Sequence, residues 1–87
     1  MHFELEFSYQ ALEDIEFHKL AGNKSVINKI LNIFQDLTDD PFQGIGKPEP
    51  LKYNLSGKWS RRITKEHRII YKVDNSTVYI FSVKGHY

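Results

Sequence analysis

Apolar and polar residues alternate over residues 2–7, which is the pattern of a strand with one buried face. Two segments with helical spacing follow. The first lies between Ser8, whose hydroxyl can cap a first helical turn, and Gly22, a residue suited to a helix end. In the second, over residues 24–37, apolar residues recur at i, i+3, i+4 and i+7 and predict a stripe that faces the core.

The second half of the chain predicts short strands joined by turns. Residues 41–50 hold all 3 prolines of the chain, so we expect an ordered, stiff loop there. Strands are expected over residues 51–55, 58–64, 68–73 and 77–83, and the last three form an antiparallel meander. The order β-α-α-β-β-β-β predicts an α+β fold, with two N-terminal helices packed on a twisted, mainly antiparallel sheet. The 87 residues are expected to form one domain, 1–87.

Composition excludes several classes of protein. The chain has 0 Cys, so disulfides and thiolate metal sites are excluded, and a reducing cytoplasm is the expected location. The first ten residues lack the basic and apolar regions of a signal peptide, and no apolar run approaches the ~20 residues that span a bilayer, so no membrane association is expected. No His, Asp or Glu cluster has metal-ligand spacing, so we expect no metal.

The charges are unevenly distributed along the chain. The net charge is +1, but most acidic residues lie in 1–40 and most basic residues in 41–87. This asymmetry is typical of a protein that binds a polyanion, although an ordinary solvated surface would also explain it. The basic half also contains aromatic residues on which bases could stack, namely Tyr53, Trp59, Tyr71 and Tyr87.

Cleavage of RNA by its own 2′-OH requires a base, a cation at the phosphate and an acid for the leaving oxygen. Glu49 lies between two prolines in basic surroundings, and Arg68 could supply the cation. His86 could act as an acid or a base near neutral pH. Taken alone, Glu49 could equally be an ordinary loop carboxylate and His86 a frayed terminal residue. His67 is a competitor for which a structural role is expected, and His2 and His18 are expected at the surface.

A longer motif runs through the second half of the chain. It reads PFQGIGKPEPLK at 41–52, NLSG at 54–57, WSRRIT at 59–64, EHR at 66–68, and then Tyr71 and the terminal His86-Tyr87. This pattern closely resembles the YoeB/Txe toxins of the RelE superfamily, which belong to bacterial type II toxin–antitoxin systems. The sequence departs from the family pattern just before its last two residues. Lys84-Gly85 occupies the two positions at which an Arg-Tyr pair is common.

The resemblance implies a RelE-like microbial ribonuclease fold and a ribosome-dependent endonuclease that cuts mRNA in the ribosomal A site without a cofactor. By position, it makes Glu49 the general base and His86 the general acid. It also makes Arg68 the group that stabilises the transition state, and Tyr87 the residue that completes the site. The RNA contacts expected with it are Lys47, Lys52, Arg61, Arg62, Lys65 and Lys84.

The resemblance also implies partners. These are a cognate YefM/Axe-type antitoxin that blocks the site, the ribosome and its mRNA, and a second copy of the chain in a homodimer. Operator DNA would be bound only through the antitoxin complex. Two other functions stay open, a ParE-type toxin directed at gyrase and an inactive toxin that acts only as a co-repressor. The set of Glu49, Arg68 and His86 favours the nuclease, because inhibition by binding alone needs no acid–base pair.

Overall fold

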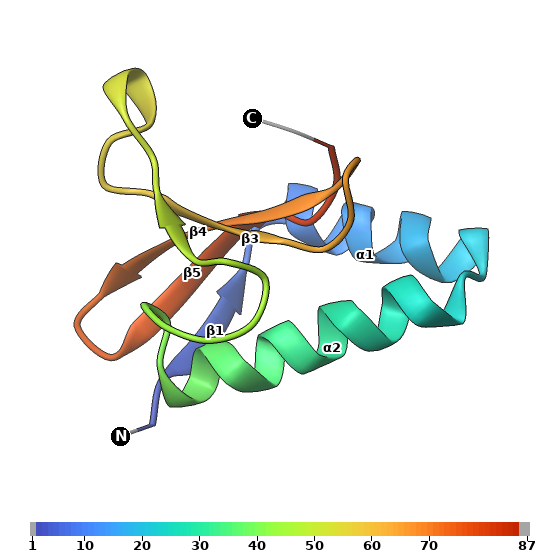
Figure 1. The fold of residues 1–87 in the computed structure, drawn as a ribbon, viewed down its shortest axis with the longest axis horizontal. Helices are drawn as coiled ribbons and strands as arrows, with labels where there is room; N and C mark the ends of the chain where they lie inside the picture. The colour runs from blue at the N-terminus through green and yellow to red at the C-terminus, as the bar shows by residue number, and fades with distance from the viewer. Residues whose placement is uncertain (1, 86–87) are drawn as a thin grey trace.

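Two helices cover one face of a 5-stranded sheet in the computed structural model, which describes residues 2–85 (Figure 1). The strands lie in the order β1-β5-β4-β3-β2, and only the β1–β5 pair is parallel. This confirms the predicted fold class. The elements are β1 (Glu4–Phe7), α1 (Tyr9–Ala21), α2 (Lys24–Asp39), β2 (Glu49–Pro50), the 3₁₀ turn η1 (Tyr53–Leu55), β3 (Trp59–Arg62), β4 (Arg68–Asp74) and β5 (Thr77–Ser82).

Ser8 and Gly22 lie at the ends of α1 as the sequence predicts. The Ser8 hydroxyl accepts the backbone N–H of Ala11 at 3.0 Å, and Gly22 ends α1 with a φ of 72°. Asn23 caps α2, which runs on to Asp39 instead of ending at residue 37. Neither helix is long and apolar enough to cross a membrane.

The core lies between the helices and the sheet. Residues of α2 such as Ile33 and Leu37 are fully buried against strand residues such as Ile69 and Val78. Each such side chain contributes about 1.5–3 kcal/mol when it leaves water. On the opposite face of the sheet, β4 exposes Lys72. Alternation along the strands therefore separates an apolar, helix-covered face from an open face rich in polar groups.

The predicted strand over residues 51–55 is wrong. This stretch forms the turn η1 instead, and the strand residues are Glu49 and Pro50 inside the predicted loop. Tyr53 has a φ of 59°, which cannot continue an extended strand, and its carbonyl accepts the N–H of Ser56. Proline is tolerated in β2 because this strand lies at the edge of the sheet and pairs only with β3.

A bulge interrupts the pairing of β4 and β5. Ile70 pairs with Ser82, whereas Tyr71 pairs with Ile80, so Phe81 is an extra residue on β5. A bulge bends the strand that carries it and redirects the chain beyond it. The C-terminal segment therefore leaves β5 close to the start of β4, beside the orange turn between β3 and β4 (Figure 1).

Candidate active site

Two of the predicted catalytic side chains lie close together on the sheet. Glu49 is held in the edge strand β2, and Arg68 begins β4 on the far side of β3. The Oε1 atom of Glu49 lies 3.8 Å from Nη1 of Arg68, with side-chain exposures of 55% and 18%. The pair is therefore open to a ligand on one side and supported by the sheet on the other.

Ser60 of β3 lies between these two residues. It pairs with Glu49 across the ladder, and its hydroxyl accepts Nη1 of Arg68 at 3.5 Å. This serine is buried, so the guanidinium rests on a fixed polar group. Ser60 is not among the site residues predicted from the sequence. Its signal was the alternation along β3, which places it on the face opposite to Arg61.

The C-terminal segment reaches the same place. The backbone N–H of Arg68 donates to the carbonyl of Gly85 over 3.0 Å. The predicted general acid His86 and the terminal Tyr87 lie outside the described residues, so their roles stay predictions. The chain does arrive beside Arg68 at the residue that precedes His86.

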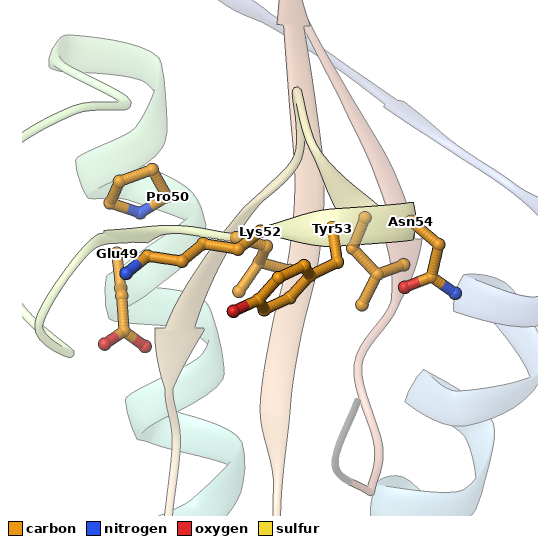
Figure 2. Close-up of a pocket in the computed structure, with 7 residues that line it drawn as sticks. Glu49, Pro50, Lys52, Tyr53 and Asn54 are labelled. Carbon is orange, nitrogen blue, oxygen red and sulfur yellow. The ribbon is translucent and has the colours of Figure 1, made fainter.

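A groove of about 400 Å³ adjoins Glu49 and runs along residues 49–55. Figure 2 shows the Lys52 side chain extending toward Glu49, with Tyr53 and Asn54 further along. Tyr53 is 89% exposed, and its backbone is in the left-handed region. Such a conformation costs roughly 1–2 kcal/mol for a residue other than glycine. A cation and an aromatic ring thus lie in the groove beside the carboxylate.

The predicted RNA-contacting residues separate into two groups. Five of the six basic side chains are exposed, namely Lys47, Lys52, Arg62, Lys65 and Lys84. Arg61 is the exception, because it is 0% exposed. Its side chain cannot reach RNA without unfolding this part of the protein, so the predicted RNA contact of Arg61 is wrong.

Arg61 instead holds the loop that leads to Glu49. Its guanidinium pairs with the Asp36 carboxylate of α2, and Nε donates to the Tyr71 hydroxyl at 3.2 Å. Burial raises the pKa of the Tyr71 phenol above its ordinary value, although the adjacent Arg61 opposes that shift. Arg61 also donates to three backbone carbonyls in and next to the loop, those of Asp40, Gln43 and Ile45.

Two further expectations are corrected. His18 is 4% exposed and lies under the C-terminal segment instead of at the surface. Tyr71 is 0% exposed and donates its hydroxyl to the Pro41 carbonyl, so it offers no ring for base stacking. Trp59 is partly buried and packs edge-on against Phe42, at 5.1 Å between ring centroids. Tyr53 is the described aromatic residue whose ring lies open beside the site.

The described residues hold no metal cluster. Among residues 2–85, no group of three His, Asp or Glu side chains converges in a way that could hold a metal ion. The groups that the ion-pair geometry and the groove bring together are the Glu49 carboxylate, the Arg68 guanidinium and the Lys52 side chain.

Residues 7–87 match the family model of the YoeB-like toxin of bacterial type II toxin–antitoxin systems. The chain belongs to this family. It is 51% identical over 65 residues to Toxin YoeB of Escherichia coli O6:H1, which covers 75% of this chain and 77% of the relative. The predicted resemblance to the YoeB toxins is thus confirmed, and the protein is a YoeB-like toxin of a type II toxin–antitoxin system.

Solved structures of YoeB toxins share the fold. The YoeB dimer from Staphylococcus aureus superposes with a TM-score of 0.85 at 40% identity, and 100% of both chains is covered. The YoeB–YefM complex from the same organism has a TM-score of 0.83 at 41% identity, again over 100% of both chains. The arrangement of helices and sheet is therefore that of the YoeB toxins.

Proposed function

We propose that this toxin is a metal-independent endoribonuclease that inhibits translation by cutting mRNA in the ribosomal A site. The observation that carries the proposal is the distance of 3.8 Å between Glu49 and Arg68 beside an open groove. A carboxylate can accept a proton from ribose, and a guanidinium next to it can meet the charge that develops on phosphate.

The proposed reaction is an internal displacement at phosphorus. Glu49 takes the proton of the ribose 2′-OH while the 2′-oxygen forms a bond to the adjacent phosphorus atom. Arg68 donates hydrogen bonds to the phosphorane oxygens, where negative charge builds up. The bond from phosphorus to the 5′-oxygen then breaks, and His86 donates a proton to that oxygen. The products are a 2′,3′-cyclic phosphate, which can open to a 3′-phosphate, and a 5′-hydroxyl end.

The exposed residues around the pair would hold the RNA. Lys52 reaches toward Glu49 along the groove and is suited to a neighbouring phosphate (Figure 2). Tyr53 offers an open ring on which an unpaired base can stack. Further phosphate contacts would come from Lys47, Arg62, Lys65 and Lys84, all of which are exposed. Tyr87 would complete the site.

The same proposal includes protein partners. The Staphylococcus aureus relatives form a YoeB dimer and a YoeB–YefM complex, which supports a homodimer and a YefM-type antitoxin for this chain. Binding of such an antitoxin would block the site, and operator DNA would be bound only through the antitoxin complex. An excess of the cognate antitoxin should therefore abolish RNA cleavage.

Primer extension on an mRNA under translation tests the proposed function. The wild type should produce ribosome-dependent cuts, whereas Glu49→Ala and His86→Ala should produce almost none. Glu66→Ala is the matched control, because Glu66 is an exposed carboxylate in the turn between β3 and β4. Full cleavage by both Glu49→Ala and His86→Ala would refute the mechanism, and absence of cleavage by the wild type would refute the function.

A further inference from the structure

The segment beyond β5 is held by buried polar side chains of α1. The Oδ2 atom of Asp14 accepts the backbone N–H of Val83 at 2.8 Å, and Nε2 of His18 lies 2.8 Å from the carbonyl oxygen of Val83. Both side chains belong to residues that are only 4% exposed. Chain termini are usually poorly ordered unless they are tied down, and here both backbone polar groups of one residue, Val83, are bound.

The next contact involves His67, in the turn before β4. Its Nδ1 atom accepts the backbone N–H of Gly85 at 3.0 Å, while the adjacent Arg68 N–H donates to the Gly85 carbonyl at 3.0 Å. The His67 ring stands edge-on to the His18 ring, with 4.8 Å between centroids and an angle of 88°. The two histidines thus join the anchor at Val83 to the anchor at Gly85.

These contacts determine where the protons lie on the two rings. A carbonyl oxygen can only accept, so Nε2 of His18 must carry the proton that it donates to Val83. A backbone N–H can only donate, so Nδ1 of His67 must be without a proton. The two imidazoles therefore have different hydrogen-bonding roles, and each role can be removed or restored separately.

Two more features fit this arrangement. The ammonium of Lys84 lies 3.9 Å from the centroid of the Phe17 ring, a cation–π contact between the segment and α1. Gly85 has a φ of 77°, which lets the chain turn so that its N–H and C=O reach two successive residues of the neighbouring turn. The departure at Lys84-Gly85 from the commoner Arg-Tyr pair thus coincides with a backbone conformation that favours glycine.

We propose that Asp14, His18 and His67 are positioning residues, which clamp residues 83–85 and so hold the backbone that precedes His86 at a fixed place beside Arg68. This inference rests on the proposed function, because it gives the clamp the task of placing the general acid. Burying polar groups is costly unless they are hydrogen-bonded, and here their bonds go to the backbone just before His86. A misplacement of about 1 Å can lower a rate roughly 100-fold.

Matched substitutions test the clamp. His67→Asn keeps an acceptor near the position of Nδ1, whereas His67→Leu removes it. His18→Gln keeps a donor near the position of Nε2, whereas His18→Leu removes it. The two Leu variants should lower kcat for mRNA cleavage by about 10- to 100-fold with little change in KM, and the Asn and Gln variants should recover most of it. His2→Leu is the control, because His2 is exposed.

A second measurement does not depend on activity. Hydrogen exchange at the amides of Val83 and Gly85 should be slow in the wild type and in His67→Asn, and the Gly85 amide should exchange faster in His67→Leu. Gly85→Ala is a second test of the clamp, to be used if the Leu variants fail to fold. An added Cβ meets nothing within 4 Å, so only the backbone preference changes, and a fall of about 5-fold in kcat is expected.

The outcomes separate the two proposals. Fast exchange at the wild-type Gly85 amide, or an unchanged kcat in His67→Leu, His18→Leu and Gly85→Ala, would overturn the clamp while leaving the nuclease intact. Equal loss in His67→Asn and His67→Leu would also overturn it, because a merely structural role predicts no rescue. If slow exchange at the Gly85 amide depends on His67 but the wild type cuts no RNA, then the proposed function is refuted. The clamp would then lose its proposed task of placing a general acid.

Discussion

Glu49 and Arg68 lie on strands that are not neighbours, yet their side chains come within 3.8 Å of each other across β3. The guanidinium spans the buried Ser60, which pairs with Glu49 and accepts a hydrogen bond from Arg68. The sheet thus brings a proton acceptor and a fixed cation to one place.

Arg68→Lys should lower the rate of RNA cleavage by about 10²–10³-fold, with a smaller effect on RNA affinity. Lysine keeps the charge but loses the fork of donors that fits a pentacoordinate phosphate. Single-turnover cleavage measures the effect. Arg62→Lys is the comparison, because Arg62 is exposed, pairs with Arg68 in the ladder and is proposed to contact RNA only through its charge, which lysine keeps, so it should lose little. A similar loss in both variants would contradict the special role of Arg68.

Lys52→Gln should weaken RNA binding and make it less sensitive to salt. One lost phosphate contact lowers the slope of log affinity against log salt by about 0.7 for a single strand. The measurement is titration of an uncleavable 2′-O-methyl RNA at several salt concentrations. Lys24→Gln, at the exposed start of α2, should leave the slope unchanged. An unchanged slope in Lys52→Gln would remove Lys52 from the RNA contacts.

Arg61→Leu should destabilise the protein by about 3–5 kcal/mol. The substitution leaves Asp36, the Tyr71 hydroxyl and backbone carbonyls of the loop without their donor. Arg62→Leu changes the next residue, which is exposed, and should shift stability by no more than about 0.5 kcal/mol. Urea unfolding compares the two variants. Similar stabilities would contradict the structural role of Arg61.

Gly46→Ala should destabilise more than Gly57→Ala. Both glycines have positive φ, 80° and 91°, so both substitutions carry a backbone cost of roughly 1–2 kcal/mol. At Gly46 an added Cβ would also lie 2.8 Å from the Arg62 carbonyl, whereas at Gly57 it meets nothing within 4 Å. An additional loss of about 1–3 kcal/mol is expected for Gly46→Ala in urea unfolding. Equal losses of unfolding free energy in the two variants would show that the loop shifts to accept the added Cβ at Gly46 without an energetic cost.

Tyr71→Phe should destabilise the protein near neutral pH by about 1–3 kcal/mol, because hydrogen bonds with Arg61 and Pro41 are lost. Burial raises the pKa of Tyr71 in the folded state, so its protonated form is the one that folding favours. The stability due to this group is fully present below the unfolded pKa of about 10 and is lost as the pH rises toward the folded pKa.

The stability difference between the wild type and Tyr71→Phe should therefore shrink as the pH rises above about 10. Urea unfolding of both proteins across the alkaline range measures it, and the comparison cancels the titration of the other tyrosines. A difference that stays constant with pH would show that Tyr71 does not titrate differently in the two states.

Local pattern was sufficient for much of the fold. Ser8 and Gly22 marked the ends of α1 because caps depend on the chemistry of a few adjacent residues. The apolar spacing of α2 and the alternation along the later strands likewise reflect repeats within one element. The motif from residue 41 onward identified the family, since it depends only on residue order.

Tertiary structure alone decided which of two adjacent arginines is available to RNA. Arg61 and Arg62 have the same chemistry, but alternation points them to opposite faces, and only the packing of α2 buries Arg61 against Asp36. For the same reason the sequence could not reveal that His18 lies beneath Val83, or that Glu49 meets Arg68. Spacing along the chain determines what forms within an element, whereas the contacts between distant elements determine what each side chain can do.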